Sequence, residues 1–105
     1  MPPRLDPIPP GEILLEEFMR PLALSQNKLA RDLDVPVARI NGIVHATRAI
    51  TADTALRLAA YLATTPEFWM SLQARYDLKR AERVIGPLLA RTIRPHRPDA
   101  AASAA

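Results

Sequence analysis

The strongest constraint on the fold of this chain is a pair of short helical patterns within residues 26–45, joined by a tight turn at residues 34–36. Each pattern has one apolar face, which consists of Leu29, Ala30 and Leu33 in the first and of Ile40 and Ile43 in the second. Because the Ala30 side chain is small, the second helix can cross the first closely. Two short helices that cross at a wide angle, with the second exposed along one side, are typical of a DNA-reading helix-turn-helix.

Length and composition limit the other possibilities. With 105 residues the chain has room for one domain and a tail, since two independent cores would be too thin. No apolar run approaches the roughly 18 residues of a membrane span, and the proline-rich start MPPRLDPIPPGE lacks the apolar stretch of a signal peptide. Cysteine is absent, which excludes disulfides and thiolate metal sites. We therefore expect a cytoplasmic protein without a membrane partner.

The charge of the chain is mildly basic and unevenly distributed. A net charge of +3 fits phosphate contact but does not by itself indicate a nucleic-acid partner. From Lys79 to Arg97 there are six basic residues and a single acid, Glu82. Such a segment can reach toward an acidic partner.

The sequence divides into four predicted parts. Residues 1–9 contain four prolines and are expected to form an extended arm. Residues 10–79 carry five helical patterns and no strand signal, which predicts an all-α helix-turn-helix domain. Residues 80–93 are predicted to form a C-terminal helical extension. Residues 94–105 have too few apolar anchors to pack and are predicted to be disordered.

Capping residues and prolines indicate where the helices begin and end. Three helices follow side chains that suit the N-cap position, namely Ser25, Thr51 and Thr65. Pro36 suits a first helical position, so the third helix is expected to run from near Pro36 to about Ala46. The pair Gly86-Pro87 is predicted to interrupt the fifth helix.

The third helix has an outward face that suits contact with base edges. On a wheel of 3.6 residues per turn with the isoleucines inward, this face carries Val37, Ala38, Asn41, Gly42 and His45. Asn41 can pair bidentately with adenine, and the small apolar side chains can pack on thymine methyl groups. Arg39 lies beside this face and can reach a guanine or a phosphate.

Gly42 has two explanations. A glycine inside a helix costs about 1 kcal/mol relative to alanine, so its presence needs a reason. It either relieves crowding against a neighbouring helix or lets the helix backbone approach DNA closely, and the sequence leaves both open.

Side chains at the ends of the helix pair are candidates for phosphate contact. Gln26 and Asn27 open the first helix of the pair, where the backbone N–H groups and the helix dipole favour an anion. Thr47 and Arg48 follow the second helix and can bind a phosphate on the far side. We therefore expect these four residues to flank the DNA-reading face.

Nothing in the sequence indicates catalysis, a cofactor or a metal site. His45 and His96 are the only histidines and lack further ligands at a suitable spacing. Glu16 and Glu17 are adjacent in a helix, so their side chains do not face each other as a catalytic pair would. We expect a chain without enzymatic activity.

The fifth helix and its extension carry more apolar surface than one small core needs. At helical spacing, the aromatic side chains of Phe68, Trp69 and Tyr76 are better explained as core or as a dimer interface than as a base-stacking platform. The predicted dimer interface consists of Trp69, Tyr76, Ile85, Leu88 and Leu89.

Four blocks of the sequence carry a resemblance to a known family: PPGEILLEEFMRPLALSQNKLARDLDVP, ARINGIV, RAITADTALRLA and TPEFWMSLQARYDL. They cover about residues 9–78, and RAITADTALRLA followed by EFW and YDL is much more specific than the helix-turn-helix alone. The chain resembles the HigA-type antitoxins, also described as virulence-associated protein I, which are small regulators with a phage-repressor-like fold. It departs from them at the turn, where Asp34 replaces the usual glycine. Aspartate tolerates the left-handed conformation better than most residues, so we expect the turn to be kept.

The resemblance implies a homodimer that binds a palindromic operator, represses its own operon and neutralises a RelE-like ribonuclease toxin. The DNA-facing positions of the family correspond here to Gln26, Val37, Ala38, Arg39, Asn41 and His45, with Arg48 near the DNA backbone. Two other functions stay open: a stand-alone helix-turn-helix transcriptional regulator, and a protein-interaction module that has lost DNA binding. Salt-dependent retention on heparin, together with a shift of the chain's own promoter fragment, separates the last of these from the others.

Overall fold

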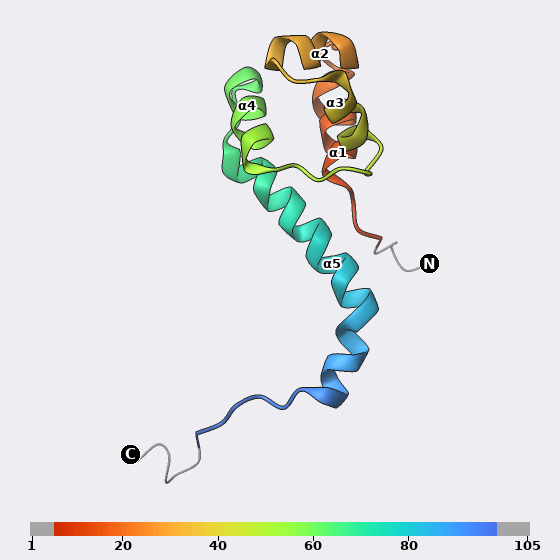
Figure 1. Ribbon diagram of the computed structural model, residues 1–105, viewed down its shortest axis with the longest axis vertical. Coiled ribbons are helices and arrows are strands. Elements are labelled where there is room, and N and C mark those ends of the chain that lie inside the picture. The colour runs from red at the N-terminus through yellow and green to blue at the C-terminus, as the bar shows by residue number, and fades with distance from the viewer. Residues whose placement is uncertain (1–5, 99–105) are drawn as a thin grey trace.

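The computed structural model describes residues 6–98, and every regular element in that range is a helix (Figure 1). The elements in chain order are α1 (Pro10–Ile13), η1 (Leu14–Met19), α2 (Gln26–Leu33), α3 (Val37–Val44), α4 (Ala52–Leu62) and α5 (Pro66–Thr92). Since η1 directly continues α1, the prediction of an all-α fold with five helices is confirmed.

The two ends of the described chain lack regular secondary structure. Residues 6–9 lead into α1, and residues 93–98 follow α5. The remainder of the predicted arm and of the predicted disordered tail, residues 1–5 and 99–105, lies outside the described residues.

The first predicted helix changes its geometry partway along. The N–H of Arg20 donates to the carbonyl oxygen of Leu15 over 2.9 Å, and the N–H of Leu24 donates to that of Met19 over 2.8 Å. The first bond spans five residues within the helix and widens its turn into the π-helix η1, whereas the second closes the turn after the helix, where Ala23 has a left-handed backbone with φ 54°. Leu14 and Met19 of η1 are buried, so the wider turn still directs its apolar side chains into the core.

Gly11 lets α1 approach α3 closely. A Cβ atom at this position would lie 1.8 Å from the carbonyl oxygen of Ile43, near the C-terminal end of α3. Only a residue without a side chain fits there. The contact therefore fixes where α3 lies relative to the first helix.

The predicted helix pair is present as α2 and α3, with one change at its turn. The Ser25 hydroxyl caps α2 by accepting the N–H of Lys28 over 3.0 Å. Asp34 has a left-handed backbone with φ 60° and ψ 48°, which confirms the expectation for this position. Pro36 is the N-cap of α3, not its first residue, because its ψ of 143° is extended. The third helix is therefore shorter than predicted and spans Val37–Val44.

The core lies between the first four helices and the beginning of α5. Its buried apolar side chains are Leu14, Met19, Leu29, Ala30, Leu33, Ile40, Ile43, Ile50, Ala55, Leu58, Ala59 and Trp69. Both apolar faces predicted for the helix pair belong to this set and are confirmed.

The helix α5 continues through Gly86 and Pro87, so the predicted interruption there is wrong. A proline inside a helix removes one backbone hydrogen bond and crowds the preceding turn. Pro87 is exposed and lies outside the core, so both effects fall on a part of α5 on which no core packing depends. The second half of α5 projects away from the other helices (Figure 1). Although α5 has 27 residues, neither it nor another helix in the described range is apolar enough to cross a membrane.

Candidate nucleic-acid interface

The helix α3 presents one side to the core and the other to solvent. Ile40 and Ile43 are buried, whereas the outward side chains predicted to face DNA are exposed: Val37, Ala38, Asn41 and His45. Val37 is 44% exposed although it is apolar. A small apolar side chain next to an exposed amide is well suited to contact thymine methyl groups and adenine edges in a major groove.

Gly42 does not belong to this exposed face, and the wheel placed it there wrongly. It is buried beneath the loop that follows α3, where a Cβ atom would lie 2.9 Å from the Cβ of Arg48. The loop folds back onto the helix end because the N–H groups of Thr47 and Arg48 both donate to the carbonyl oxygen of Gly42, over 2.9 and 3.1 Å. Relief of crowding is therefore the better explanation, with the loop and not a neighbouring helix as the crowding element.

Three of the predicted site residues form a continuous polar strip across α2 and α3. The Nδ2 atom of Asn41 donates to Oε1 of Gln26, at the start of α2, over 3.1 Å. Nδ1 of His45 lies 2.9 Å from the carbonyl oxygen of Asn41. The structure thus brings together side chains that are 15 residues apart in the sequence. Asn27 is exposed beside them, on the first turn of α2.

Arg39 is held by a carboxylate that the sequence analysis missed. Its Nη1 atom lies 2.6 Å from Oδ2 of Asp53, and the Nε atom of Arg57 lies 3.0 Å from the same oxygen. The spacing of Asp53 and Arg57 on one helix is visible in the sequence. The link from Asp53 to Arg39 is not, because it depends on how α3 and α4 pack.

The two guanidinium groups change the acidity of this carboxylate. Hydrogen bonds from Arg57 first, and from Arg39 second, hold the pKa of Asp53 below its ordinary value of 3.8. Asp53 is therefore ionised at neutral pH and places a negative charge beside the exposed face of α3.

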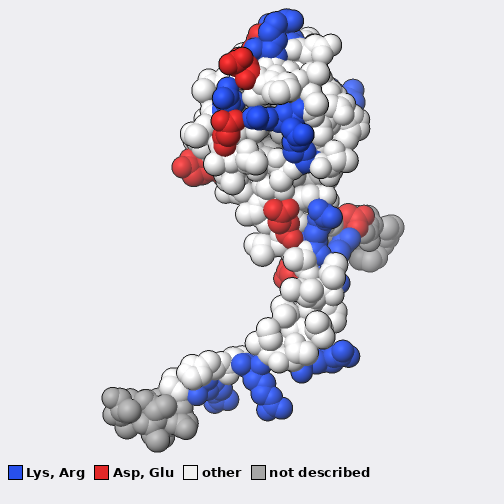
Figure 2. Space-filling model, in the orientation of Figure 1, with Lys and Arg blue, Asp and Glu red and all other residues white. Residues whose placement is uncertain are grey.

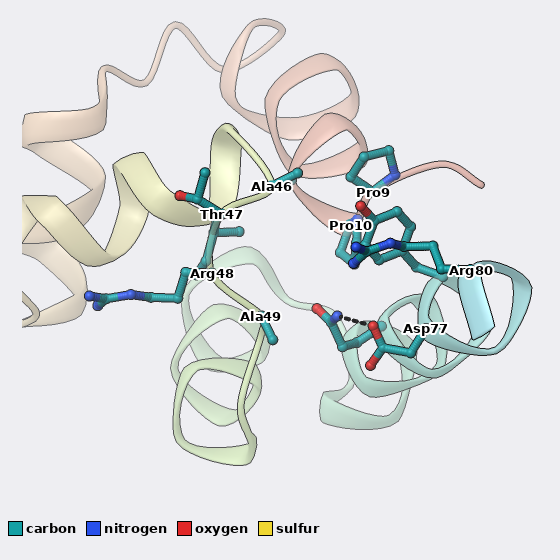
Figure 3. A pocket seen from close by; sticks show the side chains of 12 residues that line it. Pro9, Pro10, Ala46, Thr47, Arg48, Ala49, Asp77 and Arg80 are labelled. Carbon is teal, nitrogen blue, oxygen red and sulfur yellow. Dashed lines mark hydrogen bonds between the residues drawn. The ribbon is translucent and has the colours of Figure 1, made fainter. Parts of the chain in front are cut away.

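The loop after α3 places the two remaining phosphate candidates. Figure 3 shows the side chain of Arg48 pointing away from Asp77 and Arg80 of α5. The hydroxyl of Thr47 donates to the carbonyl oxygen of Gly42 over 3.3 Å. Both residues are exposed, so they are accessible to a ligand at the C-terminal end of α3.

A pocket of about 130 Å³ lies behind this loop, between the start of α1 and α5 (Figure 3). Its polar groups bind within the protomer: Gln73 accepts the N–H of Ile50 over 2.8 Å and donates to Asp77 over 3.0 Å. The guanidinium of Arg80 lies 5.1 Å from the centre of the Tyr76 ring. Within residues 6–98 there is no group of three or more histidine, aspartate or glutamate side chains that could hold a metal ion.

The predicted dimer residues separate into two groups. Trp69 is completely buried among the other aromatic side chains of its own protomer, so it belongs to the core and not to a dimer interface. Ile85, Leu88 and Leu89 are exposed on the second half of α5, and Tyr76 is partly exposed. These four stay available for a partner.

The charges of the two parts of the molecule differ. Figure 2 shows acidic and basic side chains next to each other on the helical domain, but only basic ones near the end of α5 and beyond it in this view. The domain therefore offers alternating charges beside α3, and the extension offers a positive surface.

Comparison with known proteins places these observations in a family. A family described as helix-turn-helix matches residues 15–69. Virulence-associated protein I of Dichelobacter nodosus is 51% identical over 76 residues, which cover 72% of this chain and 70% of that protein.

Two solved structures are similar over most of their length. One is an addiction module antidote protein of the HigA family from Coxiella burnetii, with a TM-score of 0.84, 46% identity and coverage of 88% of this chain and 100% of that one. The other is the Pseudomonas aeruginosa antitoxin HigA with the higBA promoter, with a TM-score of 0.84, 42% identity and coverage of 87% and 99%.

Proposed function

Because the chain belongs to the HigA family of helix-turn-helix antitoxins, we propose that it binds an operator of its own operon as a homodimer, represses that operon and neutralises a RelE-like ribonuclease toxin. The observation that carries the DNA-binding part is the polar strip of Gln26, Asn41 and His45 on α2 and α3, in which Asn41 and His45 are exposed and Gln26 is partly exposed. A structural neighbour with 42% identity was solved with its promoter DNA, which supports the same role here.

In this proposal α3 lies in the major groove and Asn41 reads a base. Asn41 uses one N–H of its amide to bind Gln26, which leaves the second N–H and the carbonyl oxygen available. These two groups are what a bidentate contact with N7 and N6 of adenine requires. The bond to Gln26 therefore orients the amide without consuming its reading capacity.

Residues at the two ends of the helix pair are proposed to hold the DNA backbone. Asn27 and the N-terminal end of α2 bind a phosphate on one side of the groove. Thr47 and Arg48 bind a phosphate on the other side, at the end of α3. Val37 and Ala38 supply apolar contacts between these two points.

The DNA-binding test is a mobility shift on the fragment upstream of the chain's own gene, titrated with salt and competitor DNA. Loss of one bidentate base contact is worth about 1–3 kcal/mol, so Asn41→Ala should weaken operator binding by roughly tenfold to a hundredfold. Its thermal stability should stay near that of the wild type because Asn41 is exposed. Ser71→Ala, an exposed change on α5, is the control and should bind normally. Full-strength operator binding by a variant that combines Asn41→Ala and Arg39→Ala overturns the assignment of α3.

Dimerisation is proposed to use Tyr76, Ile85, Leu88 and Leu89. Two protomers joined in this way would have to place their α3 helices about 34 Å apart to enter successive major grooves. A chain that ends at Leu78 should sediment as a monomer and bind a single half-site weakly. A dimer that survives this truncation moves the interface to the remaining domain.

Toxin neutralisation needs its own experiment, since a stand-alone regulator would also pass the mobility-shift test. We expect the neighbouring gene of the same operon to encode a ribonuclease that co-purifies with the full-length chain. Growth arrest by that ribonuclease should be relieved when the two are expressed together. Operator binding without any such toxin favours the stand-alone regulator, and absence of specific DNA binding favours a protein-interaction module.

A further inference from the structure

The carboxylate of Asp53 joins α3 to α4, and its partner Arg57 extends the link to α2. It lies in the first turn of α4, behind the N-cap Thr51, and its Oδ2 atom binds Arg39 of α3 and Arg57 of α4 over 2.6 and 3.0 Å. Arg57 in turn donates to the carbonyl oxygen of Leu33, at the C-terminal end of α2, over 2.8 Å. The guanidinium of Arg39 is therefore attached to the same scaffold that holds the α2–α3 turn.

The network restrains the one long basic side chain on α3. Arg39 is partly buried, with 29% of its side chain exposed, although it stands on a helix with an open outer face. An arginine without this ion pair would sample many rotamers and could bind the DNA phosphates without regard to sequence. Held at Nη1, it keeps other N–H donors in a fixed plane, and two of them are enough for a guanine edge.

We propose that Asp53 is a specificity-determining positioning residue, which fixes Arg39 so that it reads a base pair of the operator instead of binding phosphates. The proposal rests on operator binding by α3 as described above. Asp53 itself touches no DNA in this arrangement. Its charge opposes nonspecific attraction to the phosphates, and its hydrogen bond orients the guanidinium.

A positioning role and a mere charge effect predict opposite changes in specific binding. Removal of a negative charge beside the DNA, without any other change, should strengthen specific and nonspecific binding alike. If Asp53 positions Arg39, its removal should strengthen nonspecific binding while specific binding weakens. We expect the ratio of specific to nonspecific affinity to fall about tenfold in Asp53→Asn, the size of one lost base contact.

The experiment measures this ratio by fluorescence anisotropy on the operator and on a scrambled duplex, at several salt concentrations. The variants are Asp53→Asn, Arg39→Ala and both together, each checked by thermal unfolding. Asp32→Asn is the matched control, because Asp32 also binds two partners, Lys28 and Tyr61, but none of them is on α3. It should leave the ratio unchanged.

A panel of operators with single base-pair changes identifies the position that Arg39 reads. Asp53→Asn should relax the same position as Arg39→Ala, and it should have no further effect on the ratio in the Arg39→Ala background. The proposal is overturned if Asp53→Asn weakens binding equally to every operator of the panel. It is also overturned if Asp53→Asn changes the ratio equally in the wild-type and the Arg39→Ala backgrounds.

A second variant keeps the test decisive if Asp53→Asn unfolds. Asp53→Glu retains the charge at the start of α4 but moves the carboxylate by one methylene group. If Asp53 positions Arg39, the ratio of specific to nonspecific affinity should be lower in Asp53→Glu than in the wild type. If only the charge of Asp53 matters, Asp53→Glu should have the same ratio as the wild type. Failure of the wild-type chain to prefer the operator over scrambled DNA refutes the proposed function itself. A wild-type preference that both Asp53 variants keep refutes only the role of Asp53.

Discussion

The two halves of α5 have the same backbone structure and opposite surroundings. In the first half Trp69 is completely buried and Gln73 is 8% exposed, because this half packs against the domain. In the second half Val84 is 78% exposed, although its side chain is just as apolar as those of the core. The helix α5 is therefore continuous, but its side chains change from buried to exposed along its length. The boundary between the domain and the extension is visible in side-chain burial and not in secondary structure.

The first prediction uses Trp69 to measure how much the buried half contributes. Trp69→Ala should lower the free energy of unfolding by about 3–5 kcal/mol, since it removes the largest buried side chain and leaves a cavity. The indole ring lies 5.2 Å from Phe18 and 4.9 Å from Phe68, centre to centre, and its N–H donates to Thr64 over 2.7 Å. Urea unfolding followed by circular dichroism checks this value.

The matched change in the exposed half is Val84→Ala. At this position the free energy of unfolding should change by less than about 0.5 kcal/mol, because little surface is buried there in one protomer. A loss comparable with that of Trp69→Ala, at a concentration where the chain is monomeric, would break the comparison between the two halves.

The second prediction compares two glycines in the same two regions. Gly11→Ala should destabilise the domain by about 1–3 kcal/mol, because its Cβ would collide with the backbone of α3. Gly86→Ala meets no atom within 4 Å and should strengthen the extension by about 1 kcal/mol through helix propensity alone. Measured side by side, the melting temperature of the domain should fall in Gly11→Ala and stay near that of the wild type in Gly86→Ala, whose gain should appear as a stronger helical signal.

Local signals in the sequence predicted most of the fold. Caps, prolines and helical spacing depend on neighbours within one or two turns, so the starts of α2, α4 and α5 and the buried faces of α2 and α3 were predicted correctly. The exposure of Asn41 and His45 followed from the same spacing. These features need no knowledge of how the helices pack.

Two of the misses depend on contacts outside the local window. A helical wheel contains no information about the loop after α3, which covers Gly42. The pair Gly86-Pro87 is a different case, because it is a local signal for a helix end and yet α5 continues through it. The ion pair between Arg39 and Asp53 joins residues on two helices and could be found only once their packing was known.

The third prediction concerns acid sensitivity, which should belong to the domain. The pKa of Asp53 is lowered in the folded chain, so its ionised form stabilises the fold at pH values above the ordinary 3.8. That contribution is lost as the pH falls below 3.8 and through the lower pKa of the folded state. Asp53→Asn should therefore melt below the wild type at about pH 7 and approach it at about pH 2.

The extension should not be needed for this behaviour, because Asp53 and both of its arginine partners, Arg39 and Arg57, lie in the domain. A chain truncated after Leu78 should show the same narrowing between the wild-type and Asp53→Asn melting temperatures. If the difference in melting temperature no longer decreases at low pH in the truncated chain, the acid-sensitive contact depends on the extension and the comparison fails.

The smallest effect on the cooperative transition is expected from Pro87→Ala. Alanine restores a backbone N–H in the middle of the second half of α5 and removes the crowding of the proline ring, changes that favour a helix by about 3 kcal/mol per residue in an interior position. The helical signal near 222 nm should rise, while the unfolding midpoint of the domain stays within error, because no core contact is altered. Amide hydrogen exchange should slow around residue 87 and stay unchanged at the residues of α3. A shift of the domain midpoint by several degrees would mean instead that the extension folds as one cooperative unit with the core.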